Sequence, residues 1–290
     1  MNSDLYWSAE TAALADPCEF VLALAHQLRQ PALQPAHLRA VSQWEGWIGQ
    51  LKLRNAQKER KNQAGAQAKA YGHSSKEGVE LLNPLMLCEA LEAQMADDSI
   101  IVADGGDFVA TASYILRPRA PLSWLDPGAF GTLGVGGGFA LAAALARPSA
   151  EVWLIWGDGS AGYSIAEVDT MVRHGVKVMA MIGNDGAWTQ IDREQKLIFD
   201  SSVSCVLEYC DYGMVSRGYG GGGVTLSKEP EQSVAQGFKA VQVSKTAASQ
   251  RAALGAGIAR AQAESAASGK PVVINALVGA TNFRDGSLSV

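Results

Sequence analysis

Residues 151–195 read EVWLIWGDGSAGYSIAEVDTMVRHGVKVMAMIGNDGAWTQIDREQ, and this stretch decides the fold. An apolar run at 152–156 is followed by the turn GDGS at 157–160 and then by a helix of roughly three turns. A second apolar run, 176–182, ends at Asn184. Two parallel strands joined by a helix place both turns at the carboxyl edge of one sheet, where such sheets bind ligands. The sequence therefore predicts that Asp158 and Asn184 are neighbours in space.

These two side chains suggest a chemistry for that edge. A carboxylate and an amide oxygen are hard ligands that suit Mg²⁺, which usually keeps phosphates in its coordination shell. Gly159 and Ser160 begin a helix, so their N–H groups can face an anion. The pattern predicts a site for a metal-bridged diphosphate.

The wording of this stretch resembles a known motif. GDGS, a following helix and an Asn that closes the next strand resemble the thiamine-diphosphate motif of acetolactate-synthase-like enzymes. Residues 126–148 (DPGAFGTLGVGGGFALAAALARP), 184–195 (NDGAWTQIDREQ) and 282–290 (NFRDGSLSV) resemble its acetolactate synthase-like, 2-hydroxyacyl-CoA lyase 2 branch. The resemblance covers residues 82–290. A single Asp-Gly turn is common, but the combination at this spacing is specific.

The resemblance implies thiamine diphosphate and Mg²⁺ as cofactors. It implies that the metal is held by Asp158, Asn184 and the main-chain carbonyl of Gly186. The residues that it implies for the cofactor itself are Gly106, Asp107, Gly131, Leu133, Gly157, Asp158, Gly159, Ser160, Asn184 and Gly186. Among them, the carbonyl of Gly131 and the bulky Leu133 would set the pyrimidine ring. Related synthases have amide and imidazole side chains where this chain has Asp107 and Phe108, so Asp107 is either a cofactor contact or a helix N-cap.

Further candidates are less specific. Three residues follow the metal loop (residues 184–186): Trp188, Gln190 and Glu194. They either shape the substrate pocket or lie on the surface of a short helix. Phe283 and Arg284 are candidates for substrate contact, since the tail closes over the site in some relatives. His174 ends the helix after GDGS, where a histidine is favoured near the last carbonyls.

Composition limits the class of protein. Of 290 residues, 48% are hydrophobic, and 24 basic against 29 acidic residues give a formal charge of -5, which offers no argument for nucleic acid or an anionic membrane. No run approaches the ~20 apolar residues of a membrane helix, and the first residues do not read as a signal peptide. We expect a soluble, intracellular protein. The cysteines lack metal-site spacing, so buried, reduced thiols are expected for Cys18, Cys88, Cys205 and Cys210.

The order of elements predicts two parts. Residues 64–290 are expected to form a doubly wound, mostly parallel six-stranded sheet with helices on both faces. Residues 1–63 are interpreted as the remnant of a middle domain and a linker, with helices at 18–28 and 36–54. The basic run at 52–61 faces water or touches a CoA phosphate, and residues 229–248 are interpreted as a peripheral insertion.

The predicted function is a thiamine-diphosphate- and Mg²⁺-dependent lyase or carboligase acting on a C–C bond, most like 2-hydroxyacyl-CoA lyase. Condensation of 2-keto acids to acetolactate is an alternative, and so is a non-catalytic cofactor-binding or interaction protein. In the resembled family the activating glutamate comes from a separate pyrimidine-binding domain, so we expect no catalytic residue in this chain. An exposed apolar face would then pair with a homo-oligomeric copy or with a partner that carries that domain.

Overall fold

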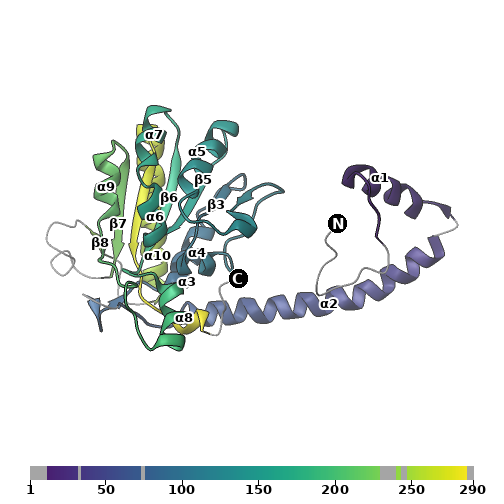
Figure 1. The fold of residues 1–290 in the computed structure, drawn as a ribbon, viewed down its shortest axis with the longest axis horizontal. Coiled ribbons are helices and arrows are strands. Elements are labelled where there is room, and N and C mark those ends of the chain that lie inside the picture. The colour runs from purple at the N-terminus through teal and green to yellow at the C-terminus, as the bar shows by residue number, and fades with distance from the viewer. Residues whose placement is uncertain (1–11, 32–33, 73–75, 229–239, 243–246, 286–290) are drawn as a thin grey trace. The chain divides into compact units, whose positions relative to one another are not determined.

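The computed structural model describes residues 12–31, 34–72, 76–228, 240–242 and 247–285 (Figure 1). The chain divides into two compact units, Met1–Arg60 and Lys61–Val290. Reading the first as the remnant of a middle domain stays a prediction. None of the helices in these described ranges is both long enough and apolar enough to cross a membrane.

Helix α1 (Pro17–Leu28) lies in the first unit, and α2 (Gln34–Gly65) begins there and ends in the second. The Asp16 side chain caps α1 by accepting hydrogen bonds from two backbone N–H groups of its first turn. Helix α2 is longer than the predicted 36–54, because the Lys, Arg, Glu, Gln and Ala residues that follow are good helix formers. Trp44 and Trp47 pack edge to face, with ring centroids 5.3 Å apart.

In the described residues of the second unit, a seven-stranded, fully parallel sheet has the strand order β4-β3-β5-β6-β9-β7-β8. Its strands are β3 (Ile100–Ala103), β4 (Trp124–Leu125), β5 (Val152–Gly157), β6 (Val178–Asn184), β7 (Gly222–Ser227), β8 (Ala240–Gln242) and β9 (Val272–Leu277). The doubly wound α/β class and the six predicted strands are confirmed. The seventh, β8, is an edge strand inside the segment predicted to be a peripheral insertion, so that segment contributes to the sheet.

The central strands owe their place to their composition. Every residue of β5 and β6 is buried, as expected of parallel strands that are covered on both faces. Their register pairs Trp156 with Ile182 and Gly157 with Gly183, so the turns after the two strands begin at the same level of the sheet. This is the arrangement that the sequence predicts for Asp158 and Asn184.

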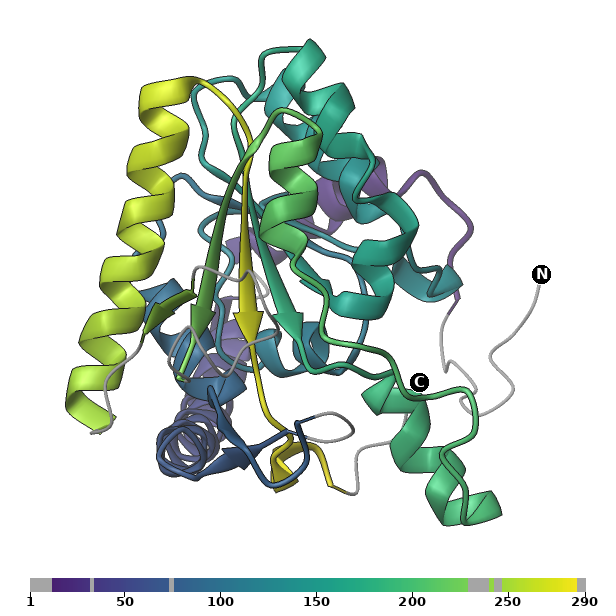
Figure 2. The ribbon, with the colours of Figure 1, turned by 90° about the vertical axis from the view of Figure 1, so that its left-hand side faces the viewer.

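Helices cover both faces of the sheet. One layer holds α3 (Pro84–Glu92), α4 (Asp107–Ala112) and α10 (Ala247–Ser268), and the other holds α5 (Gly136–Ala146), α6 (Asp158–Ser164), α7 (Glu167–Arg173) and α9 (Tyr212–Gly218). Figure 2 shows α10, in yellow, on one side of the strands and the second layer on the other. Each layer has its own apolar core, around Leu85 and Ile258 in the first and Ala161 and Met171 in the second.

The helix predicted after GDGS is interrupted. It consists of α6 and α7. Where they join, hydrogen bonds connect residues three rather than four positions apart, from Val168 N to the Ile165 carbonyl (3.1 Å) and from Asp169 N to the Ala166 carbonyl (3.0 Å). His174 is the C-cap residue of α7, the position predicted for it. All four cysteines are free, and Cys88 and Cys205 are buried as expected, whereas Cys18 and Cys210 are exposed, contrary to the prediction.

Several short elements complete the second unit. Two of them form a small antiparallel sheet apart from the main one. These elements are β1 (Ala70–Tyr71), β2 (Glu80–Leu81), η3 (Gly128–Phe130), α8 (Thr189–Phe199) and η4 (Asn282–Arg284). Helix α8 follows β6 directly at the carboxyl edge of the sheet and carries the candidates Gln190 and Glu194.

Candidate functional site

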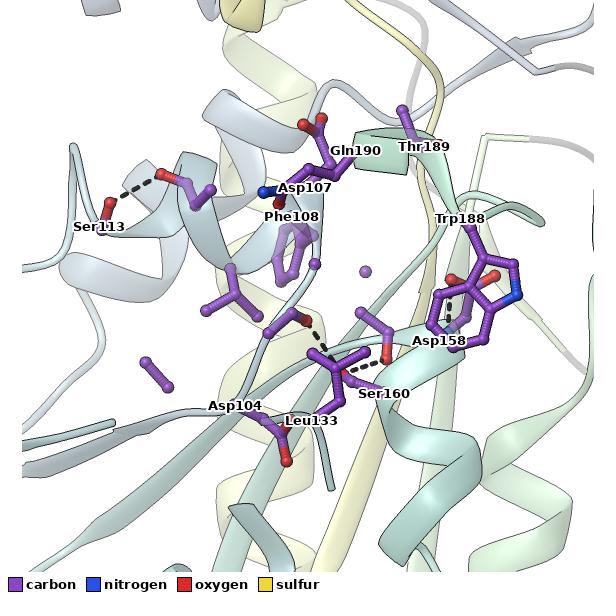
Figure 3. Close-up of a pocket in the computed structure, with 18 of the residues that line it drawn as sticks. Asp104, Asp107, Phe108, Ser113, Leu133, Asp158, Ser160, Trp188, Thr189 and Gln190 are labelled. Atoms are coloured by element: carbon purple, nitrogen blue, oxygen red, sulfur yellow. Dashed lines mark hydrogen bonds between the residues drawn. The ribbon is translucent and has the colours of Figure 1, made fainter. Parts of the chain in front are cut away.

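A cavity of about 560 Å³ opens at the carboxyl ends of β3, β5 and β6 (Figure 3). All the predicted cofactor residues line it except Asn184, the last residue of β6, and Gly186, in the loop that follows. Figure 3 shows Leu133, Asp158 and Trp188, which come from segments far apart in the sequence, around the cavity. The parallel topology thus gathers turns that are far apart in the sequence into one site.

Asp158 links the turns after β5 and β6. It begins α6, and its carboxylate accepts hydrogen bonds from Gly159 N at Oδ1 and from Gly186 N at Oδ2, both at 2.9 Å. The side chain is buried, and burial raises the pKa of Asp158 to about 6 even though these two bonds act in the opposite direction. A buried carboxylate of this kind favours a cation beside it.

Asn184, the last residue of β6, has an oxygen without a partner. Its Nδ2 donates to the Cys210 carbonyl (2.9 Å) and to Asn275 Oδ1 (3.1 Å). Its Oδ1 is buried and accepts no hydrogen bond from the described part of the chain. An unsatisfied buried acceptor costs about 1–3 kcal/mol. A divalent cation would satisfy this oxygen, so the residues present fit Mg²⁺.

The neighbouring groups fit the same ion. Burial and the nearby Asp158 carboxylate raise the pKa of Asp185 well above its usual value. The carbonyl of Gly186 accepts one hydrogen bond, from Leu207 N at 2.8 Å, and a carbonyl has a second lone pair. Among the described residues no three His, Cys, Asp or Glu side chains gather as a metal cluster. The oxygen atoms available to a metal are the Asp158 carboxylate, the Asn184 amide oxygen and the Gly186 carbonyl, and such oxygen ligands suit a hard cation.

The turn after β3 approaches the turn after β5 closely. Gly106 has a φ of 106°, which favours glycine, and an added Cβ there would lie 3.5 Å from Gly157 Cα. Gly157 N donates to the Gly105 carbonyl at 3.2 Å. The buried Ser160 hydroxyl lies 3.0 Å from the same carbonyl. The Ser160 side chain thus joins the two turns.

Asp107 is not an N-cap, so that alternative is wrong. Gly106 holds the N-cap position of α4 without a side-chain bond, and Asp107 is the first helical residue. The Asp107 carboxylate instead pairs with Arg193 Nη2 of α8 at 2.5 Å and lies 3.8 Å from Arg284 Nε. The guanidinium of Arg284 also lies over the Tyr114 ring, 5.6 Å from its centroid. Asp107 lines the cavity and links α4 to α8 through Arg193 and to η4 through Arg284.

Leu133 and Gly131 reach the cavity from the glycine-rich segment. Leu133 packs against Gly105, where an added Cβ would lie 2.1 Å from Leu133 Cδ2. Gly131 has a φ of 65° and ends η3. Both residues line the cavity, and their roles toward the pyrimidine ring stay predictions.

Asp104 is a site residue that sequence reasoning missed. Its buried carboxylate accepts from Gly134 N (2.9 Å), Gly136 N (2.7 Å) and Trp156 Nε1 (3.1 Å). It therefore fixes the segment that carries Leu133. An aspartate directly after a buried strand was the available signal, but its partners could not be read from spacing.

Trp188 and Gln190 line the cavity, whereas Glu194, Phe283 and Arg284 do not. The Trp188 indole covers Gly159, where an added Cβ would lie 2.4 Å from its Cζ3 atom, and Figure 3 shows the ring beside Asp158. Trp188 N donates to the Cys205 carbonyl at 2.8 Å. Trp188 therefore forms a wall over the first turn of α6.

Comparisons with known proteins agree with this geometry. Residues 104–276 match the family model described as thiamine pyrophosphate enzyme, C-terminal TPP binding domain. The whole chain is 43% identical over 289 residues to 2-hydroxyacyl-CoA lyase 2 of Danio rerio and 42% identical over 290 residues to that of Homo sapiens. A probable acetolactate synthase of Mycobacterium bovis is 40% identical over 151 residues, which is 52% of this chain and 28% of that protein. The chain spans 40% of the length of the two lyases.

Proposed function

Because this chain belongs to the thiamine pyrophosphate enzymes, whose C-terminal TPP-binding domain it contains, we propose that its cavity holds the cofactor diphosphate through Mg²⁺. Asp158, Asn184 and the Gly186 carbonyl would bind the ion, and Ser160 would meet the diphosphate with its backbone N–H group. Gly159, whose N–H group donates to Asp158 Oδ1, would lie against the diphosphate. The single observation that carries this proposal is the buried Asn184 Oδ1, which has no partner in the described residues.

The reaction we propose is cleavage or formation of a C–C bond next to a carbonyl. Thiamine diphosphate supplies the electron sink for such chemistry when it is bound, and the protein positions it. Cleavage of a 2-hydroxyacyl-CoA to an aldehyde and formyl-CoA is preferred, because the similarity to 2-hydroxyacyl-CoA lyase 2 extends over the whole chain. Condensation of 2-keto acids to acetolactate is the second candidate, since the acetolactate synthase matches 52% of the chain.

The chain's own residues have supporting tasks in that reaction. Trp188 would exclude water from the first turn of α6, because its ring covers Gly159. Asp107 would hold α8 against the cavity through Arg193. Asp104 would keep the segment with Leu133 in place through its three hydrogen bonds. None of these groups is proposed to transfer a proton.

We propose that the glutamate that activates the cofactor comes from a pyrimidine-binding domain outside these 290 residues. The lyases are longer than this chain, which leaves room for such a domain in them. Large apolar side chains are exposed beside the cavity's lining segments, with Phe130 88% and Leu197 84% accessible. We propose that these side chains contact a partner domain or a second copy of a longer protein.

The test mixes the full chain with thiamine diphosphate, Mg²⁺ and a separately produced pyrimidine-binding domain of a lyase relative. Mass spectrometry then detects the products from a 2-hydroxyacyl-CoA or from pyruvate. We expect aldehyde and formyl-CoA in the mixture and none with the chain alone. Acetolactate without formyl-CoA would favour the second candidate. Binding of the partner domain without any turnover would favour the non-catalytic alternative.

A further inference from the structure

Three buried polar residues lie in neighbouring strands of the sheet, of which β7 also contains the buried Ser227. Asn184 lies in β6, Asn275 in β9 and Thr225 in β7, and each is at most 5% exposed. Asn275 pairs with Ile182 in β6 and with Thr225 in β7. Since residues two apart on a strand face the same side, Asn184 shares the face of Ile182. The three side chains therefore lie on one face of the sheet, near its carboxyl edge.

The Asn275 amide determines how Asn184 is oriented. Asn184 Nδ2 donates to Asn275 Oδ1 at 3.1 Å and to the Cys210 carbonyl at 2.9 Å, so both of its protons are used. Asn275 Nδ2 donates to the same Cys210 carbonyl at 3.2 Å. Turning the Asn184 amide by 180° would place its oxygen against two acceptors. Only one orientation is satisfied, and in it Oδ1 is the free atom.

The Cys210 carbonyl is itself held in place. The segment before it bonds to the metal loop through Trp188 N to the Cys205 carbonyl and Leu207 N to the Gly186 carbonyl. The next residue, Asp211, caps α9 through Met214 N and receives a bond from the Thr225 hydroxyl at 3.2 Å. Thr225 thus supports the segment, whereas Asn275 contacts Asn184 directly.

We propose that Asn275 is a positioning residue for the metal: it fixes the Asn184 amide so that Oδ1 rather than Nδ2 is presented to the cation. This inference rests on the metal assignment of the proposed function. A buried amide in the strand VVINAL is costly unless it is hydrogen-bonded. Here the Asn275 Oδ1 atom accepts its hydrogen bond from Asn184, the proposed metal ligand. Residues that orient metal ligands typically account for about 10–100-fold in metal affinity.

The experiment titrates Mn²⁺, which takes the same oxygen ligands as Mg²⁺, into the full chain and measures bound metal by electron paramagnetic resonance. In Asn275→Leu, Asn184 loses one acceptor, and we expect about 10–100-fold weaker binding. Asn275→Asp keeps the acceptor for Asn184 Nδ2 but loses the donor to the Cys210 carbonyl, so its affinity should lie between those of the wild type and Asn275→Leu. Ile274→Val, the matched control beside Asn275 in β9, faces the opposite side of the sheet and should leave the affinity unchanged.

The outcomes separate the two proposals. If the wild type binds no Mn²⁺, the metal assignment fails and the inference fails with it. If it binds and a folded Asn275→Leu binds equally well, or Asn275→Asp loses as much as Asn275→Leu, the metal site stands and the positioning role is wrong. A second readout needs no variant at position 275. Nuclear magnetic resonance of the wild type should show both Asn184 side-chain amide protons protected from exchange, and rapid exchange of either would overturn the orientation argument.

Discussion

Replacing Gly159 with alanine tests whether Trp188 forms a fixed wall over the first turn of α6. An added Cβ would lie 2.4 Å from Cζ3 and 2.6 Å from Cε3 of the indole. Carbon atoms in contact are normally about 3.5–4.0 Å apart, so the ring would have to move by roughly 1 Å or more. The clash joins a helix backbone to a rigid ring, which leaves no flexible end to give way. We expect Gly159→Ala to lower the free energy of unfolding by about 1–3 kcal/mol.

Gly162 provides the matched control in the same helix, because nothing lies within 4 Å of an added Cβ there. Gly162→Ala should be neutral or stabilising by up to about 1 kcal/mol, since alanine favours a helix over glycine. Urea unfolding followed by far-ultraviolet circular dichroism compares both variants with the wild type. It also compares Trp188→Leu with the double variant Gly159→Ala/Trp188→Leu. Removing the ring should cancel part of the alanine penalty, with a coupling energy of about 1 kcal/mol or more.

Two results would refute this reasoning. Gly159→Ala could prove as stable as the wild type while Gly162→Ala behaves as expected, which would mean that the Trp188 ring moves freely. Alternatively, the penalties of Gly159→Ala and Trp188→Leu could add without coupling. In either case Trp188 would not be a fixed wall of the cofactor site.

Three further predictions concern other parts of the second unit. Asp104→Asn should lower the free energy of unfolding by about 2–3 kcal/mol, because an amide oxygen cannot accept all three buried bonds that the carboxylate receives; equal urea midpoints and slopes would contradict this. The hydrogen bond from Lys228 lowers the pKa of Glu80 in the folded chain. The ionised Glu80 carboxylate therefore stabilises the fold when the pH is above the unfolded-state pKa, and this stabilisation is lost as the pH falls through the folded-state pKa. Glu80→Gln should therefore be less stable than the wild type at pH 7 and equal to it in acid, whereas a difference that does not change with pH would exclude the ion pair as its cause. Phe130→Ser should weaken association with the partner domain in analytical ultracentrifugation without changing the unfolding curve, because the Phe130 side chain is 88% exposed; unchanged association would remove it from the interface.

The fold followed from features that are local in the sequence. The apolar runs of β5 and β6 are buried on both faces, so they needed no alternating pattern to be recognised. Their parallel connection then fixed the edge at which the turns after the two strands meet, and the bond from Gly186 N to Asp158 Oδ2 joins those turns. Strand β8 was missed because it pairs only at the edge of the sheet, with β7, and lies in a segment with weak apolar character.

The parts of the site that were not predicted depend on pairs that are distant in the sequence. Asp107 and Arg193 are 86 residues apart, and Asn184 and Asn275 are 91 residues apart. Spacing cannot reveal such partners, because they depend on the order of strands in the sheet and on where α8 lies. Asp107 resembled an N-cap for the same reason: an aspartate after two glycines has that local pattern, and only the folded chain supplies the competing guanidinium groups.

Calorimetric titration of thiamine diphosphate into the purified chain, with and without Mg²⁺, tests the central claim most directly. The account predicts binding that requires Mg²⁺ and disappears in Asp158→Ala, while the circular dichroism spectrum of that variant stays native. Binding that is equally strong without Mg²⁺, or unchanged in a folded Asp158→Ala, would contradict the assignment of Asp158, Asn184 and Gly186 as the ligands that join the ion to the diphosphate.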